Sequence, residues 1–221
     1  MSHHNFMIMK KILIVVLSFM MINSFAQSSR FNVTDQGRNF KGFRVTDKHD
    51  TIQGSFVVYL QFLMQTGCSM NDGNGKDLYG NTWDNTICYE LENGLKWYST
   101  KYTTLTPPAD KKRIGDECFL HVMEAGPITL YDYNFYDQSV TPGVNEVKIY
   151  IQLPDGKVVD VSGLLLGFPK KMGEYIKDYA ELAIKVTNKE KGYGFANINS
   201  VVREYNAWYM AKNPTFTIMN K

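Results

Sequence analysis

The sequence predicts an α+β fold, in which a mostly antiparallel β region is followed by a C-terminal two-helix hairpin packed on it. Two patterns indicate this. From Gly42 to Val161, runs with apolar residues at alternate positions are separated by short stretches rich in Gly, Asn and Asp, as is typical of strands and turns. After Gly167 the apolar residues recur every three to four positions, as on one face of a helix. Two amphipathic helices must bury their apolar faces, and the β region is the available partner.

The β region is expected to begin with a hairpin that follows a polar arm at residues 27–40. Phe43 and Val45 alternate with polar neighbours, Thr46–Asp50 supplies turn-forming residues, and a second apolar run follows. The next segment, Gly67–Asn81, is rich in Gly and Asn and is expected to be a loop.

The remaining strands are expected to flank shorter turns. Glu92-Asn93-Gly94 contains a tight-turn step, and residues 103–116 are expected to form a connection. Pro154-Asp155-Gly156 turns the strongly alternating hairpin Val147–Val161. The other expected strands are Thr86–Leu91, Leu95–Thr100, Glu117–Met123 and Ile128–Tyr136.

Both predicted helices have recognisable ends. Pro169 suits the first turn of the first helix, and Asn197 is the candidate N-cap of the second, which ends before Pro214. A Gly-containing loop, Lys191–Ala196, joins them. The apolar face of the first helix comprises Met172, Tyr175, Ile176, Tyr179, Leu182, Ala183 and Val186, and that of the second comprises Ile198, Val201, Val202, Tyr205, Trp208 and Tyr209.

The first 26 residues have the pattern of a signal peptide. Lys10 and Lys11 form a positive start, and Ile12–Ile22 is an apolar run with one serine. The small residues Ser24 and Ala26 then precede a cut after Ala26. An N-terminal membrane anchor is the alternative, although the apolar run is shorter than the ~20 residues that span a bilayer.

The expected organisation is therefore a signal peptide at 1–26, a β-rich region at 27–166 and a helical hairpin at 167–221, the last two forming one compact unit. The protein is expected to be exported in soluble form, to the periplasm or the cell exterior, with no stable membrane span once the leader is removed. The sequence leaves the translation start open between Met1, Met7 and Met9.

The charge balance argues against nucleic-acid partners. The chain has 24 basic and 22 acidic side chains, and removing Lys10 and Lys11 with the leader leaves 22 against 22. A neutral chain is a poor nucleic-acid binder, because such binding requires clustered Lys and Arg. The hydrophobic fraction of 44% argues equally against a disordered chain.

Three cysteines follow the leader: Cys68, Cys88 and Cys118. In an oxidising compartment an odd number allows at most one internal disulfide, and the spacing does not determine the pairing. Burial of the cysteines as small apolar side chains is the alternative.

The sequence predicts no catalytic or metal-binding residue and no cofactor. His49 lies in the first predicted turn, where a solvated residue is expected. Cys118 and His121 are three apart on a predicted strand and therefore face opposite sides. The loop Asp72–Asp77 resembles the start of a calcium loop, but Lys76 occupies a ligand position.

One strand carries the candidate binding residues. Tyr131, Tyr133 and Phe135 share one face of the segment, with Asp132 and Asn134 on the other. Such an aromatic face suits a sugar- or peptide-binding platform, and it equally suits ordinary packing of a sheet against a helical cap.

Three segments resemble an uncharacterised group of exported, signal-peptide-bearing proteins common in Bacteroidota-type bacteria: KGFRVTDKHDTIQGSF, ECFLHVMEAGPITLYDY and FPKKMGEYIKDYAELAIKVTNKEKGYGFANINSVVREYN. The resemblance covers about three quarters of the chain after the leader. It implies compartment and architecture, and it supplies no catalytic residue because the group has no assigned activity.

The leading interpretation is an exported envelope or periplasmic protein that binds an envelope protein or a glycan and catalyses nothing. The alternative is a periplasmic hydrolase whose carboxylate site is dispersed along the chain, since paired carboxylates meet only in space. A structural envelope component that docks through its helical cap is a third possibility.

Overall fold

Ten strands form a single antiparallel sheet in the part of the chain that the computed structural model describes, residues 33–74, 76–80, 86–101, 117–137 and 144–216. The strands are β1 (Asn39–Thr46), β2 (Thr51–Val57), β3 (Cys68–Asn71), β4 (Asp77–Gly80), β5 (Thr86–Leu91), β6 (Lys96–Lys101), β7 (Glu117–Glu124), β8 (Thr129–Asp137), β9 (Val144–Gln152) and β10 (Val158–Asp160). Their order across the sheet is β10-β9-β8-β7-β6-β5-β1-β2-β3-β4, so most strands pair with their neighbours in the chain.

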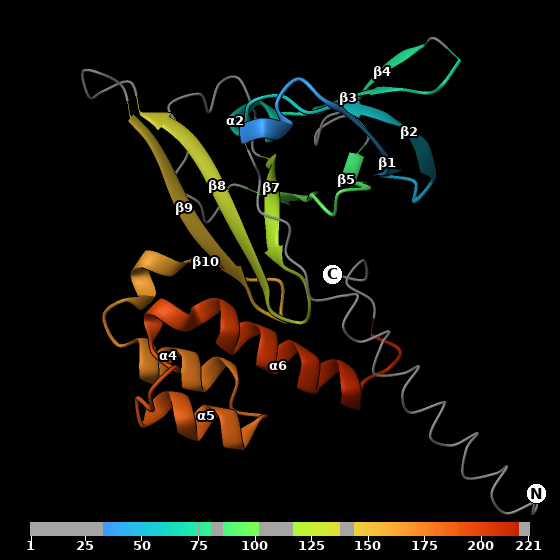
Figure 1. Ribbon diagram of the computed structural model, residues 1–221. Coiled ribbons are helices and arrows are strands. Elements are labelled where there is room, and N and C mark those ends of the chain that lie inside the picture. The colour runs from blue at the N-terminus through green and yellow to red at the C-terminus, as the bar shows by residue number, and fades with distance from the viewer. Residues whose placement is uncertain (1–32, 75, 81–85, 102–116, 138–143, 217–221) are drawn as a thin grey trace, which may run out of the picture.

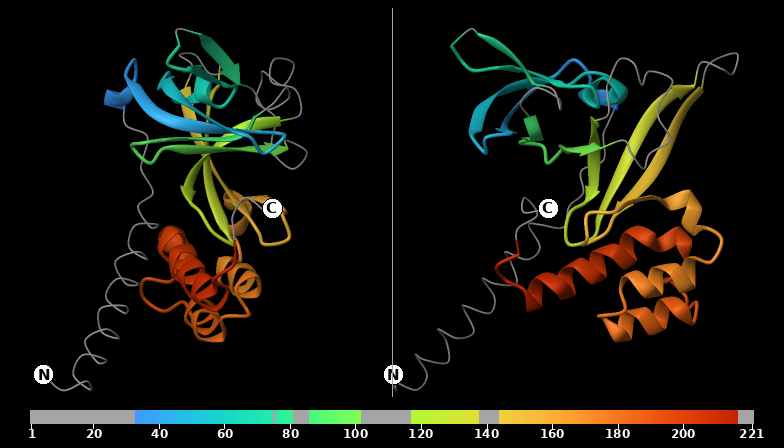
Figure 2. Two further views of the ribbon diagram at one scale, coloured as in Figure 1. Left: turned by 90° about the vertical axis from the view of Figure 1, so that its right-hand side faces the viewer. Right: turned by 180° about the vertical axis from the view of Figure 1, so that it is seen from behind.

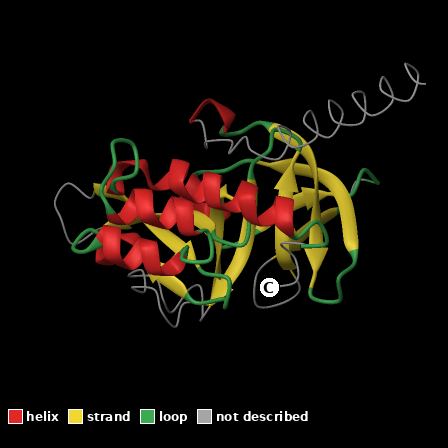
Figure 3. Ribbon diagram, turned by 90° about the horizontal axis from the view of Figure 1, so that it is seen from below, coloured by secondary structure: helices red, strands yellow, loops and turns green. Residues whose placement is uncertain are grey.

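Three α-helices follow the sheet, which confirms the predicted α+β class with a C-terminal helical part. In Figure 1, α4, α5 and α6 lie together below the lower ends of β8 and β9, whereas β1–β4 lie at the other end of the sheet. The side and rear views of Figure 2 show the same separation, and Figure 3 shows the helices side by side across the strands. The helical elements are η1 (Val33–Asp35), α2 (Gln61–Met64), η3 (Val161–Leu164), α4 (Phe168–Tyr175), α5 (Ala180–Thr187), η4 (Phe195–Asn197) and α6 (Ile198–Lys212).

The predicted hairpins are confirmed. β1 and β2 pair around the polar turn at 47–50, and β9 and β10 pair around residues 153–157. Gly94 and Gly156 have φ angles of 85° and 83°, a left-handed conformation that glycine adopts without a steric penalty. These two tight turns therefore depend on Gly94 and Gly156, the glycines from which the turns were predicted.

The prediction of a continuous loop at Gly67–Asn81 was wrong, because β3 and β4 occupy most of the described part of this segment. Cys68 and Met70 alternate inward and are buried, and β3 pairs with β2. The turn between the strands is short: the Asp72 carboxylate accepts hydrogen bonds from the backbone N–H groups of Asn74 (2.8 Å) and Lys76 (3.3 Å). Asn and Asp here close a hairpin and do not break the sheet.

The prediction of one helix from Pro169 to Val186 was also wrong. The chain turns back at residues 176–179, so that α5 packs against α4. Where the two helices pack, a Cβ at Gly173 would lie 2.6 Å from Thr187 Oγ1. Because Gly173 has no side chain, α4 and α5 can pack closely against each other at this point. One continuous helix could not fold back on itself in this way.

Within the described ranges, the buried apolar side chains form three clusters. One joins the helices to Leu130 and Ile151 of the sheet, and it contains most of both predicted helical stripes. The second surrounds Trp97 and Phe119 near α2. The third includes Tyr131. The first and third clusters cover opposite faces of β8, because neighbouring residues of a strand point to opposite sides.

Among the residues described, no helix is both long and apolar enough to cross a bilayer. The predicted leader at 1–26 and the predicted connection at 103–116 fall outside the described ranges.

Candidate functional site

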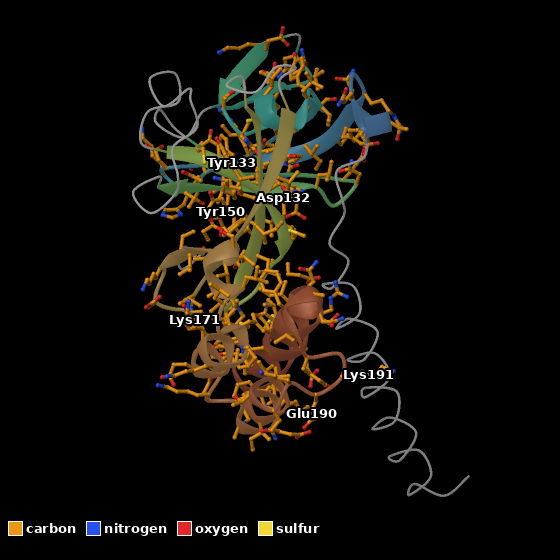
Figure 4. All side chains as sticks on the ribbon, turned by 90° about the vertical axis from the view of Figure 1, so that its left-hand side faces the viewer. Asp132, Tyr133, Tyr150, Lys171, Glu190 and Lys191 are labelled. Carbon is orange, nitrogen blue, oxygen red and sulfur yellow. The ribbon has the colours of Figure 1, made fainter. Side chains whose placement is uncertain are left out.

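The aromatic face of β8 is buried. Tyr131 and Tyr133 are only 1% and 3% exposed, and the side chain of Phe135 lies outside the described residues. Tyr131 donates a hydrogen bond to Gln152 Oε1 at 2.7 Å, and Tyr133 meets the Tyr150 ring edge to face. Figure 4 shows Tyr133 and Tyr150 on the paired strands. The burial of Tyr131 and Tyr133 favours ordinary sheet packing over an open platform.

The reverse face of these strands carries a His–Asp pair that sequence reasoning missed. Trp97, His121 and Asp132 are direct cross-strand partners on β6, β7 and β8, so they share one face. His121 Nδ1 lies 3.1 Å from Asp132 Oδ1, and the His121 ring centroid lies 5.2 Å from that of Trp97. Cys118 lies in the cluster on the opposite face, as predicted.

The His121 imidazole is well oriented and inaccessible. A carboxylate at Nδ1 fixes the ring and its tautomer, which is how such pairs prepare Nε2 to exchange a proton. Here His121 is 1% exposed, and no group in the described part of the chain bonds its buried Nε2. The Trp97 Nε1 is likewise buried, and no group in the described part of the chain accepts its hydrogen. In this conformation the pair therefore joins β7 to β8 and offers no open catalytic group.

No sequence signal could have brought this pair together. His121 and Asp132 are eleven residues apart, and their alignment depends on a register shift between Val122 and Glu124. A shift of one residue would move one partner to the other face. The register shift between Val122 and Glu124 therefore determines which residues pair, and the residue types alone do not predict it.

A buried acid on β7 is neutralised by a cation on α6. Glu124, which is 6% exposed, forms an ion pair with Arg203 of α6. The hydrogen bond from Arg203 to this carboxylate, reinforced by the attraction between the charges, raises the pKa of the guanidinium. Because a buried carboxylate without a partner is strongly destabilising, the pair fixes α6 on the sheet.

Asn206 fastens the same helix to the turn between β7 and β8. Its Oδ1 accepts from the Ile128 backbone N–H at 3.1 Å, and its Nδ2 donates to the Ile128 carbonyl at 2.7 Å. Gly126 leaves room for this contact, since a Cβ there would lie 2.3 Å from Asn206 Cγ. We call this arrangement of Gly126, Ile128 and Asn206 the turn lock.

The cysteines are buried thiols, and no disulfide joins Cys68, Cys88 or Cys118. This outcome matches the alternative of burial as small apolar side chains. Burial raises the pKa of Cys88 to about 11, with a smaller contribution from the charge of Glu90. The thiol therefore stays protonated, and thus weakly nucleophilic, near neutral pH.

The other candidates occupy turns. His49 lies in the β1–β2 turn with a φ of 64°, and its backbone N–H bonds to the Thr46 carbonyl. Backbone hydrogen bonds, that from Asn74 first, lower the pKa of Asp72, so its carboxylate is used within the β3–β4 turn. Within the described ranges, no group of three or more His, Cys, Asp or Glu side chains is placed to hold a metal ion.

The most exposed large apolar side chains among the described residues adjoin the start of α4. Leu165 is 59% exposed and Leu166 is 85% exposed. We call these two residues the leucine pair. Their neighbours Leu164 and Phe168 are buried and anchor the chain on both sides.

The backbone around the leucine pair is held by specific contacts. Asp160 accepts a hydrogen bond from the Ser162 backbone N–H at 2.7 Å and so caps η3. The Lys171 ammonium donates to the Gly163 carbonyl at 2.7 Å, which brings the first turn of α4 back to η3. The leucines are therefore exposed from a fixed loop.

No protein-family model, curated protein or solved structure matches the chain. Function is therefore inferred from the chain's own residues.

Proposed function

We propose that the protein is exported by the leader at 1–26, belongs with the Bacteroidota-type exported group that it resembles, and binds a partner in the cell envelope without catalysing a reaction. The observation that carries the binding function is the leucine pair. Leu165 and Leu166 remain exposed although the adjacent Leu164 and Phe168 are buried.

Exposed aliphatic residues on a fixed loop suit binding. Isolated apolar side chains on a surface are common, but two consecutive ones held by a capped turn and a lysine bridge form a pre-ordered contact. Pre-ordering lowers the entropy lost on association, because the loop does not have to be immobilised by the partner.

The segments that carry the resemblance support shared architecture. The middle segment contains Gly126 and Ile128, and the last segment ends at Asn206. These are the residues of the turn lock, which joins α6 to the sheet. The motifs therefore contain residues that hold the fold, as expected for a group defined by architecture.

The competing hydrolase would need two carboxyl groups that face one reacting bond. Three carboxyl groups face other protein groups instead: the half-buried Asp132 faces His121, the buried Glu124 faces Arg203, and the exposed Asp178, in the turn between α4 and α5, accepts from the Tyr205 hydroxyl at 3.0 Å. These partners favour a structural role for each acid.

Export is tested by fractionating cells that express the full chain and by determining the N-terminus of the recovered protein. We expect recovery from the envelope or the medium, with a chain that starts at Gln27. Recovery of the uncut chain from the cytoplasm would contradict export.

Binding is tested with a photoactivatable amino acid at Leu166 and, as a control, at the exposed residue Glu174. We expect a discrete crosslinked product, protein or lipid, from position 166 only. Equal crosslinking at the two positions would contradict the role of the leucine pair. Turnover of a glycan or peptide that is abolished by Asp132→Ala or Glu124→Ala, without unfolding, would favour the hydrolase.

A further inference from the structure

We propose that the partner of the leucine pair is an anionic lipid surface, into which Leu165 and Leu166 insert while Lys170 and Lys171 contact the headgroups. This inference rests on the proposed envelope function and names the class of partner. Three properties of the loop lead to it: the shape of its apolar part, the charges around it, and its size.

The leucine pair projects from the loop, and no helix or strand among the described residues covers it. Leu166 is the most exposed of the large hydrophobic residues, and Leu165 beside it is more than half exposed. Because Leu164 and Phe168 anchor the loop and Asp160 caps η3, the pair does not need to rearrange to enter a bilayer. Transfer of each leucine out of water strengthens partitioning by about ten- to a hundredfold.

The charges beside the leucine pair complement an anionic surface. Lys170 and Lys171 follow in the first turn of α4, and both are exposed. The Lys171 ammonium bonds to Gly163, so it lies at the loop itself. The next acid along α4, Glu174, is bonded to Lys177 at 2.6 Å and thus has its own cation. Each lysine near an anionic membrane strengthens binding about fivefold.

The size of the exposed part favours lipid over protein. A stable protein interface buries about 800 Å² on each partner and involves roughly 20–30 residues. Two leucines and two lysines are far fewer, but a few inserted apolar side chains with adjacent cations are sufficient for reversible binding to an interface. Lipid therefore fits the loop better than a second copy or another protein.

The test uses the protein purified from the compartment in which it resides, mixed with vesicles of phosphatidylcholine alone or with phosphatidylglycerol added. We expect binding to the anionic vesicles that weakens as salt increases. L165S/L166S should bind at least tenfold more weakly. K170Q, which leaves the bridge from Lys171 to the Gly163 carbonyl in place, should bind about fivefold more weakly to anionic vesicles and be unchanged on neutral ones.

Matched controls come from the same helical part. I184S removes an aliphatic residue that is 58% exposed on α5, and K189Q/K191Q removes two exposed lysines. Figure 4 shows Lys171 and Lys191 well apart. Both control variants should bind like the wild type. Circular dichroism checks that each variant is folded.

Insertion is measured independently by placing Trp at position 166 or 184. Brominated lipids should quench the added fluorescence of L166W and leave that of I184W unchanged. The proposal is overturned if the wild type fails to bind anionic vesicles, if L165S/L166S binds equally well, or if the leucine pair mediates only self-association. A failed vesicle assay with an exported, crosslinking protein would reject lipid and leave the envelope function standing.

Discussion

Asn206→Ala should destabilise the protein strongly, because the Asn206 side chain is buried and bonded to a buried backbone. The wild-type side chain satisfies both the N–H and the carbonyl of Ile128, a residue that is fully buried. Each buried backbone group left without a partner costs about 1–3 kcal/mol. The variant should therefore lose roughly 2–6 kcal/mol for the two groups, a large part of a total stability that is typically about 5–15 kcal/mol.

The assay is equilibrium unfolding in urea, followed by circular dichroism and by tryptophan fluorescence. Asn213→Ala is the matched control, because Asn213 also bonds a backbone carbonyl, that of Tyr209 at 2.9 Å, but is exposed. It should change the free energy of unfolding by no more than about 0.5 kcal/mol. If Asn206→Ala is equally mild, the turn lock does not hold α6 to the sheet as described.

A double-mutant cycle sharpens this prediction. A Cβ at Gly126 would displace the Asn206 side chain, so Gly126→Ala should break the same hydrogen bonds. The two substitutions should therefore be non-additive, with Gly126→Ala mild in the Asn206→Ala background. Full additivity would mean that Gly126 serves another purpose.

Three further predictions concern pH, helix packing and the buried ion pair. Because the fold raises the pKa of Cys88 from 9.0 to about 11, the unfolded chain loses this proton first, and stability should fall as pH rises from about 9 to about 11. Cys88→Ala should reduce that slope in unfolding curves recorded across the range. Gly173→Ala should lower the midpoint of thermal unfolding, and a second change, Thr187→Ala, should recover part of the loss because it removes the clashing Oγ1. Arg203→Met should cost about 1–3 kcal/mol in urea unfolding by leaving Glu124 buried without its cation, and the double variant with Glu124→Gln should be more stable than Arg203→Met alone.

Local signals were sufficient for most of the fold. Turn sequences such as Asn93-Gly94 and Pro154-Asp155-Gly156 impose a backbone conformation that few other residues adopt, so the hairpins could be placed from residue types alone. The helical stripes likewise mark the faces that must be buried. The break between α4 and α5 could not be placed this way, because the stripe continues through it and only Gly173 permits the close packing.

The candidate site was less accessible to sequence reasoning. The pattern placed Tyr131 and Tyr133 correctly on one face but could not tell whether that face is open, because burial depends on the curvature and packing of the whole sheet. The leucine pair carries no motif either. Leu164 ends η3 and Phe168 begins α4, and both are buried, so the two leucines between them are left on the surface. This exposure depends on where η3 and α4 lie, which the residue types do not determine.

The turn lock also sets the order in which the chain can fold. Asn206 and Ile128 are 78 positions apart, so the β7–β8 turn acquires its hydrogen bonds to Asn206 only after that residue has left the ribosome. Contacts between such distant residues form slowly, because a long loop must close first. Nascent chains therefore lack the hydrogen bonds between α6 and the β7–β8 turn until α6 itself has been synthesised.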